Sequence, residues 1–422
     1  MKRQYWKFYW PLALTGMVML LARQFQNGTL SRYPNAARQL ATFAFASGML
    51  MPFMSALGFL PQMANVFGRS CTARRRCLRF TFMLCAALAA IPACIALVPG
   101  AEIVPARIFG IADEQLAVVI LYLRLLTPML FVQGLKQYYT GLLVQAKRTG
   151  LVTVLHGSAL ALMGSLLAVG LHRGWQPVVT LAASQICAGL LHLALLFGFA
   201  RRGGAGIQEP ETKHLTYLDM ARFFWPVALT SLMFALSRPI IYSYVNRTPG
   251  AEPKIAALRV AFDLALIFHM PVNQLRHLFV TFGFKDMPGL RRFILLVLAG
   301  ALGIMLLVAL SPLSMLVLRD LLGVRGAVLP MARQVLLTVC LIPVLVAVRN
   351  YFHGRAMVSR TTVSMGLGAT LRVAAIWLAS WAGYATGMLN HTLAALILTL
   401  GFAVETLTVA LVGRRQRHVC SL

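Results

Sequence analysis

The chain has 422 residues, of which 59% are hydrophobic and only 12% are charged, and its mean hydropathy is +0.75. Soluble domains carry roughly 45–50% apolar and about 25% charged residues, so this composition excludes an ordinary soluble enzyme, and it is too apolar for a disordered chain. Lys and Arg number 39 against 11 Asp and Glu, a net charge of +28. In a membrane protein such an excess first reflects basic cytoplasmic loops, so we expect the lipid bilayer as a partner and no nucleic acid.

Long apolar runs follow one another along the whole chain. A helix needs about 20 mostly apolar residues to cross a bilayer, and the sequence contains twelve such runs. They cover residues 8–27, 39–63, 78–98, 116–145, 151–172, 178–200, 221–245, 256–282, 292–318, 328–356, 361–383 and 390–413. We therefore predict an all-α polytopic membrane protein with twelve transmembrane helices. No small-residue cleavage site follows the first run, which predicts a retained helix and not a signal peptide.

Charges in the connections predict the orientation. Basic residues gather in alternate loops, as in Arg74-Arg75-Arg76 and near the end of the chain at Arg414-Arg415. The opposite loops hold acids, among them Glu102 and Asp320. By the positive-inside rule, both termini are predicted to be cytoplasmic.

The two halves of the sequence repeat each other. FYWPLALTGMVMLLAR, ending at Arg23, matches FFWPVALTSLMFALSR, ending at Arg238, and KQYYTG from Lys136 matches RNYFHG from Arg349. With six spans in each half, the repeats have the same orientation, and a pseudo-twofold axis along the membrane normal should relate them. We predict an N-terminal six-helix lobe at 1–202, a cytoplasmic linker at 203–219 and a C-terminal six-helix lobe at 220–422. Such repeats place the substrate between the lobes, and rocking of the lobes gives alternating access.

Ionisable residues inside spans are the candidate site. Seven basic residues lie at membrane depth against two acids, Asp263 and Glu405, so five positive charges stay uncompensated even if both acids are paired. Charges inside a bilayer are costly and face a cavity or a partner, and arginine suits phosphate or carboxylate oxygens. The predicted substrate-binding residues are Arg23, Lys136, Arg238, Arg276, Arg349, Arg372, Asn273 and His269.

Structural roles for these residues stay open. Arg23 and Arg238 could reach the outer headgroups, and Lys136 and Arg349 could reach cytoplasmic lipid phosphates. Arg372 could pair with Glu405. Arg124, the seventh basic residue, could lie on a lobe surface, Asp263 could pair with Arg259 one turn away, and His269 could be a packed, hydrogen-bonded histidine. Prolines inside spans, such as Pro128, Pro271 and Pro343, should bend helices.

Motifs of enzymes are missing from the sequence. We find no Walker A loop, no HExxH, no GxSxG and no carboxylate pair of the glycosidase type. None of the seven cysteines forms a CxxC or pairs with histidine at zinc spacing. We therefore expect neither an enzyme nor a cofactor or metal site.

Several segments resemble the progressive ankylosis (ANKH) transporters. They are FFWPVALTSLMFALSRPIIYSYVNR, His269-Met270-Pro271, Val348-Arg349 with Gly354, Leu371-Arg372, and VETLTV around Glu405. The similarity is stronger in the second half, and this chain lacks the long charged tail of the animal proteins. The resemblance implies a bacterial-type member in the inner membrane, with a fold similar to the multidrug/oligosaccharidyl-lipid/polysaccharide (MOP) exporters that include the MATE transporters. It also implies export of small anions such as pyrophosphate, nucleotides such as ATP, or citrate.

Other functions remain as alternatives. A MATE-type cation or drug antiporter needs a carboxylate at depth, often in the first lobe, and the first lobe has none inside a span. A flippase of lipid-linked anionic sugars would also want a basic cavity. A membrane scaffold without transport does not explain seven buried cations. A monomer suffices for a path between two lobes.

Overall fold

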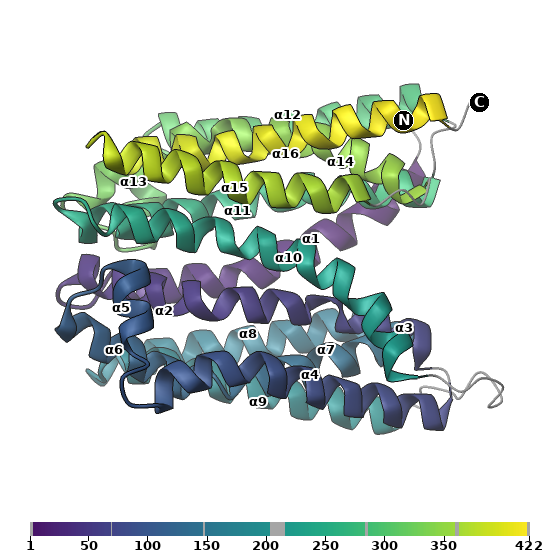
Figure 1. Cartoon of the computed structure of the whole chain (residues 1–422), viewed down its shortest axis with the longest axis horizontal. Helices are drawn as coiled ribbons and strands as arrows, with labels where there is room; N and C mark the ends of the chain where they lie inside the picture. The colour runs from purple at the N-terminus through teal and green to yellow at the C-terminus, as the bar shows by residue number, and fades with distance from the viewer. Residues whose placement is uncertain are drawn as a thin grey trace. The chain divides into compact units, whose positions relative to one another are not determined.

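The computed structural model describes residues 3–68, 70–146, 148–202, 216–282, 286–358 and 363–419, and these contain helices and loops but no strand (Figure 1). Within them, ten helices are long and apolar enough to cross a membrane, which confirms an all-α polytopic membrane protein. Two further helices, α1 (Arg3–Leu30) and α10 (Tyr217–Val245), lie where the first and seventh spans are predicted. At 28 and 29 residues, each is long enough for a hydrocarbon core of about 30 Å.

The chain packs as two compact units that do not coincide with the two halves of the sequence. The terminal unit holds residues 1–44 and 237–422, and the internal unit holds residues 45–236. The first helix belongs with the second half because α1 packs along α11 (Ala251–Phe282). Most of the predicted linker, 203–215, lies outside the described residues, and 217–219 form the first turn of α10.

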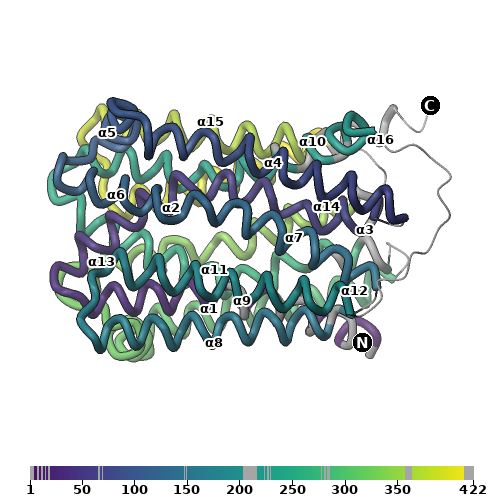
Figure 2. Tube along the Cα trace, turned by 90° about the horizontal axis from the view of Figure 1, so that it is seen from below, coloured from purple at the N-terminus to yellow at the C-terminus, as the bar shows by residue number. Residues whose placement is uncertain are grey.

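The buried apolar cluster of the internal unit includes residues of two short helices, η1 (Leu57–Phe59) and α3 (Leu60–Phe67). The unit contains the end of α2 (Ala36–Ala56), η1, α3, α4 (Cys71–Leu97), α5 (Ile103–Phe109), α6 (Asp113–Leu126), α7 (Met129–Gln145), α8 (Thr149–His172), α9 (Pro177–Arg202) and the start of α10. Helices α8 and α9 run side by side (Figure 2). Leu57, Leu60, Cys77 and Phe224 share a buried apolar cluster, so the thiol of Cys77 serves packing.

The terminal unit is built around α11, which contacts α1, α12, α13 and α14. Its elements after α11 are α12 (Met287–Leu310), the π-helix η2 (Met315–Leu321), α13 (Val328–Thr338), η3 (Val339–Leu341), α14 (Ile342–Val358), α15 (Val363–Ala385) and α16 (His391–Val419). Helix α1 begins and α16 ends at the same end of this unit (Figure 1). A chain whose first helix begins and whose last helix ends on the same side of a membrane crosses that membrane an even number of times.

Proline explains where two predicted spans are interrupted. The span predicted at 116–145 is broken between α6 and α7 at Thr127-Pro128, and that predicted at 328–356 is broken at η3, just before Pro343. Proline donates no backbone hydrogen bond and clashes with the preceding turn. The prediction of a ninth span at 292–318 is wrong at its end: α12 stops at Leu310, where Ser311-Pro312 closes the helix and a π-helix follows.

Close helix contacts fix the position of α11. The Tyr9 hydroxyl on α1 donates to the Pro271 carbonyl at 2.6 Å. On the other side, Gly354 of α14 lies against the ring of Phe279, and a Cβ there would come within 2.5 Å of the Phe279 Cβ. The missing side chain therefore lets α14 approach α11.

We expect Gly354→Ala to lower the stability of the purified protein by about 1–3 kcal/mol, because an added methyl group forces two packed helices apart. Gly303→Ala on α12 is the matched control, since a Cβ there meets nothing within 4 Å. That change should be neutral or stabilising by roughly 0.5–1 kcal/mol. Thermal unfolding in detergent compares the two. Equal melting temperatures for both variants would show that the α11–α14 contact does not need the glycine.

Candidate functional site

Three helices of the terminal unit converge on Asp263 of α11, a carboxylate that is almost fully buried. Arg238 of α10 places Nη1 2.6 Å from Asp263 Oδ1 and donates its Nη2 to the Phe262 carbonyl at 3.0 Å. Arg23 of α1 places Nη1 3.5 Å from the same Oδ1. The two repeat-equivalent arginines therefore share one counter-ion.

Asn27 of α1 extends this group of side chains. Its Nδ2 donates to Asp263 Oδ2 at 3.1 Å, and its Oδ1 accepts from Arg259 Nε at 2.9 Å. The Arg259 guanidinium also lies 4.3 Å from the centre of the Phe43 ring. Sequence spacing suggested a local Arg259–Asp263 pair, whereas the structure adds Asn27 as a bridge between them. We call Arg23, Asn27, Arg238, Arg259 and Asp263 the Asp263 cluster.

A second group surrounds Glu405 of α16. Glu405 Oε2 lies 2.5 Å from Arg372 Nη1 on α15 and 3.2 Å from Arg349 Nη1 on α14. His353 Nε2 lies 3.9 Å from Oε1, and both guanidinium groups lie over the ring of Phe402. The alternative that Arg372 pairs with Glu405 is thereby confirmed. We call Arg349, His353, Arg372 and Glu405 the Glu405 cluster.

Polar residues of α11 lie between the two clusters along the chain. Asn273 accepts a hydrogen bond from Arg349 Nη2 at 3.0 Å. Asn350, next to Arg349, donates to the Val272 carbonyl at 2.9 Å. His269 is buried with no hydrogen-bond partner on Nε2 among the described residues, and the same holds for Nε of the half-buried Arg276. Two hydrogen bonds thus join the polar run around Pro271 to α14.

The two clusters differ in access. In the Asp263 cluster, 30% of the Arg23 side chain and 24% of the Arg238 side chain remain exposed. In the Glu405 cluster, the exposed fractions are 6% for Arg349 and 1% for Arg372. Each cluster holds more arginine than carboxylate. The first pair of guanidinium groups is therefore partly exposed, while the second pair is buried inside the helix bundle.

Lys136, the remaining predicted residue, belongs to the internal unit. It lies half-buried on α7, and the same unit holds His156 of α8 and His192 of α9. These two imidazole rings meet edge to face with centroids 4.3 Å apart. Arg124 is not part of this group: it is exposed and donates to the Ala96 carbonyl at 2.7 Å.

The repeat relates this lysine to the Glu405 cluster. An offset of 213 residues carries Lys136 to Arg349, and the same offset carries His192 to Glu405. The position that holds an acid in the second half therefore holds an imidazole in the first. The first half therefore keeps the cation, Lys136, but has a histidine where the second half has the carboxylate of Glu405.

Sequence reasoning missed Asn27, His353 and Asn350. Asn27 is a polar residue in an apolar helix. A buried amide needs hydrogen-bond partners, so its position in the sequence could have indicated a polar contact. His353 and Asn350 lie in the RNYFHG segment that was used only to detect the repeat. Among the described residues, no three His, Cys, Asp or Glu side chains come together as metal ligands.

Comparison with models of protein families finds no match, and comparison with curated proteins finds none either. Solved structures do match over nearly the whole chain. An inward-facing multidrug resistance MATE family transporter of the MOP superfamily has a TM-score of 0.75 at 13% identity, covering 96% of this chain and 97% of that one. The lipid II flippase MurJ, in an inward closed conformation, has a TM-score of 0.68 at 12% identity, covering 94% and 86%.

A third structure is a MOP superfamily transporter from Pyrococcus furiosus, in which the reverse polarity of the binding pocket suggests a different function. It has a TM-score of 0.59 at 12% identity and covers 96% of this chain and 94% of that one. At these identities the comparisons establish the fold. The chain has the fold of the MOP superfamily, as the sequence predicted, and it is an integral membrane protein.

We expect Glu405→Gln to destabilise the protein by about 3–5 kcal/mol, because it leaves Arg349 and Arg372 buried without their counter-charge. Asp320→Asn is the matched control, since that carboxylate pairs with Arg319 while both side chains are about half exposed; it should change stability by less than about 1 kcal/mol. Chemical unfolding in detergent micelles measures both. A Glu405→Gln protein as stable as the Asp320→Asn protein would contradict the role given to Glu405.

Proposed function

We propose that this chain is a secondary transporter that exports small polyanions, with pyrophosphate, nucleotides such as ATP, or citrate as the substrates. The observation that carries the proposal is the excess of arginine over carboxylate in the Asp263 cluster, together with the partial exposure of Arg23 and Arg238. The two partly exposed guanidinium groups share one carboxylate, so the pair carries a net positive charge, and the planar guanidinium favours phosphate and carboxylate oxygens.

The other predicted residues take different parts in this proposal. Asn273, His269 and Arg276 follow Asp263 along α11 and would extend the polar path for the substrate. Arg349 and Arg372 would act at longer range, through the positive field that they add inside a low-dielectric protein. Lys136 would supply a cation in the internal unit.

The route and orientation are also part of the proposal. Parallel six-helix repeats favour a substrate site between two lobes and alternating access by their rocking. The basic loops favour cytoplasmic termini in a bacterial inner membrane. The resemblance to the progressive ankylosis transporters supports the choice of substrates, and the MOP fold supports membrane transport. The transporter from Pyrococcus furiosus supports the idea that this fold accepts pockets of more than one polarity.

Two alternatives have their own supporting observations. The MATE neighbour favours a cation or drug antiporter. Such an antiporter would use a carboxylate at depth, and both Asp263 and Glu405 are engaged by arginine. The MurJ neighbour favours a flippase of lipid-linked anionic sugars, for which an arginine-rich site is suitable. The polyanion proposal rests on the same site and needs no lateral access from the lipid.

In proteoliposomes, we expect efflux of pyrophosphate, ATP or citrate to exceed that of an organic cation, and binding of these anions to weaken as salt rises. Vesicles without protein give the background rate. Transport of organic cations but of no polyanion would replace this proposal with the antiporter. Translocation of a lipid-linked sugar with no movement of the soluble anions would replace it with the flippase.

We expect Arg238→Ala to weaken anion binding about tenfold to hundredfold, the effect of losing one charge-assisted contact of roughly 1.5–3 kcal/mol. Arg238→Lys should recover only part of this loss, because an ammonium lacks the two-pronged geometry of a guanidinium. Arg319→Ala, at an exposed arginine of the same unit, is the control. Anion binding is measured in detergent beside thermal stability. Wild-type affinity in a folded Arg238→Ala protein would remove this residue from the site.

A further inference from the structure

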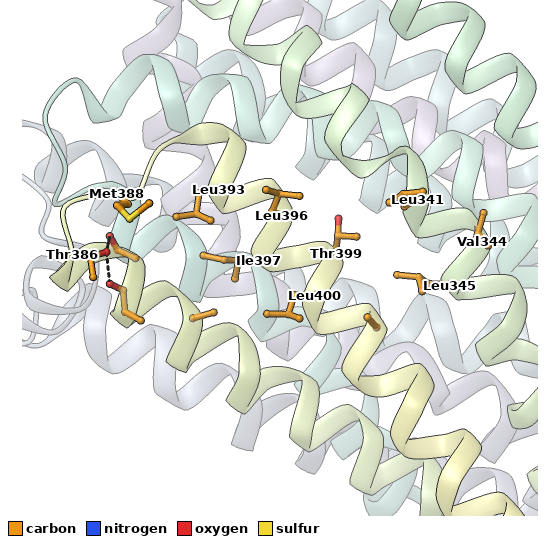
Figure 3. Close-up of a pocket in the computed structure, with 14 residues that line it drawn as sticks. Leu341, Val344, Leu345, Thr386, Met388, Leu393, Leu396, Ile397, Thr399 and Leu400 are labelled. Atoms are coloured by element: carbon orange, nitrogen blue, oxygen red, sulfur yellow. Dashed lines mark hydrogen bonds between the residues drawn. The ribbon is translucent and has the colours of Figure 1, made fainter.

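A groove of about 770 Å³ opens on the terminal unit between α14, α15 and α16 (Figure 3). Leu396, Ile397 and Leu400 of α16 line its middle. Leu341 and Leu345 lie at the end farthest from the loop between α15 and α16. Leu396 and Leu400 are each about half exposed. The lining is apolar along its whole length, so the groove suits a hydrocarbon chain.

The two threonines of the groove do not change this character. Thr386 donates its hydroxyl to the Ala382 carbonyl at 2.9 Å, and Thr399 donates to the Ala395 carbonyl at 3.1 Å. Both hydroxyl groups are therefore satisfied by the backbone of their own helices, and their methyl groups are left for the groove. A polar ligand would find no donor there that is not already used.

The groove has the length of one membrane leaflet. Its lining on α16 runs from Leu393 to Ala403, a stretch that rises about 15 Å in an α-helix. This is about half of a hydrocarbon core of about 30 Å. At one end of the groove lies Met388, in the loop that joins α15 to α16 (Figure 3).

A basic pocket of about 510 Å³ shares Met388 with the groove. Arg247, Lys254, Thr248 and Asn390 line it, and they come from two neighbouring loops and the first turn of α11. Gly250 and Gly387 shape these loops with φ values of 62° and 69°, which glycine adopts without strain. No acid lines the pocket among the described residues.

Lys254 is held so that its charge faces this pocket. Its ammonium donates to Thr248 Oγ1 at 3.1 Å and to the Pro249 carbonyl at 2.7 Å, which leaves a third N–H for a ligand. The Arg247 guanidinium lies 5.4 Å from the centre of the Tyr244 ring. An arginine and a lysine in a pocket whose described lining has no acid, beside an apolar groove, match the two ends of an anionic amphiphile.

We propose that this pocket and groove together bind one anionic phospholipid, with the phosphate at Arg247 and Lys254 and an acyl chain along α16. The loops of the site lie at the end of the terminal unit opposite to the start of α1 (Figure 1). The lipid therefore belongs to the leaflet opposite to that of the N-terminus. This site uses none of the residues of the Asp263 or Glu405 clusters and is independent of the transported substrate.

Native mass spectrometry of the purified full chain tests the proposal, with phosphatidylglycerol and phosphatidylcholine of identical acyl chains as probes. We expect phosphatidylglycerol to bind at least about tenfold more tightly, because only its headgroup carries a net negative charge. The double variant Arg247→Gln with Lys254→Gln should abolish this preference, while Arg319→Gln, which removes an exposed arginine outside the site, should keep it. Equal binding of the two lipids by the wild-type protein would overturn the proposal.

The contribution of the groove is tested separately. Leu400→Trp should fill it and weaken phosphatidylglycerol binding severalfold, whereas Leu407→Trp, at an exposed position on the same helix outside the groove, should not. Glycerol 3-phosphate, which has the headgroup charge without chains, should bind far more weakly than the lipid. If it binds as tightly, the pocket is a site for free phosphate compounds, and the lipid proposal is wrong.

Discussion

Asp263 and Glu405 hold the arginines of four helices inside a chain that crosses the bilayer. An unpaired guanidinium in that environment would cost several kilocalories per mole. The helices of the terminal unit that carry these arginines therefore pack against the helices that carry the two carboxylates. Asp263 draws α1 and α10 to α11, and Glu405 draws α14 and α15 to α16. Hydrogen bonds from Asn27 and to Asn273 complete both groups. Association between membrane helices gains little from apolar contact, which lipid also offers, and polar pairs of this kind therefore decide which helices meet.

The two carboxylates do not leave the arginines in equivalent states. Around Glu405, two guanidinium groups are buried and directed at one carboxylate, so this cluster is a fixed part of the helix bundle. Around Asp263, 30% of the Arg23 side chain and 24% of the Arg238 side chain remain exposed. The same residue type is thus buried around Glu405 and partly exposed around Asp263, and this exposure is what separates the two clusters.

The repeat-equivalent positions of the internal unit hold different polar groups from those of the Glu405 cluster. Lys136 takes the position of Arg349, and His192 takes that of Glu405, so a lysine and two histidines replace an arginine pair with its acid. The two halves therefore keep a common helix pattern and differ in their polar groups. In the terminal unit, a basic pocket and an apolar groove lie next to each other and share Met388.

The sequence by itself determined the fold class and the approximate position of the helices, because a run of about 20 apolar residues is a local property. The repeat matched Arg23 with Arg238 in the sequence. Only the tertiary structure decided that both meet at Asp263, that Asn27 and His353 belong to the clusters, and that α1 packs with the second half of the chain. It also decided the end of α12, since Ser311-Pro312 closes a helix that hydropathy alone would extend. These outcomes depend on which buried polar groups come into contact although they lie far apart in the sequence. The periodicity of an apolar pattern does not predict such contacts.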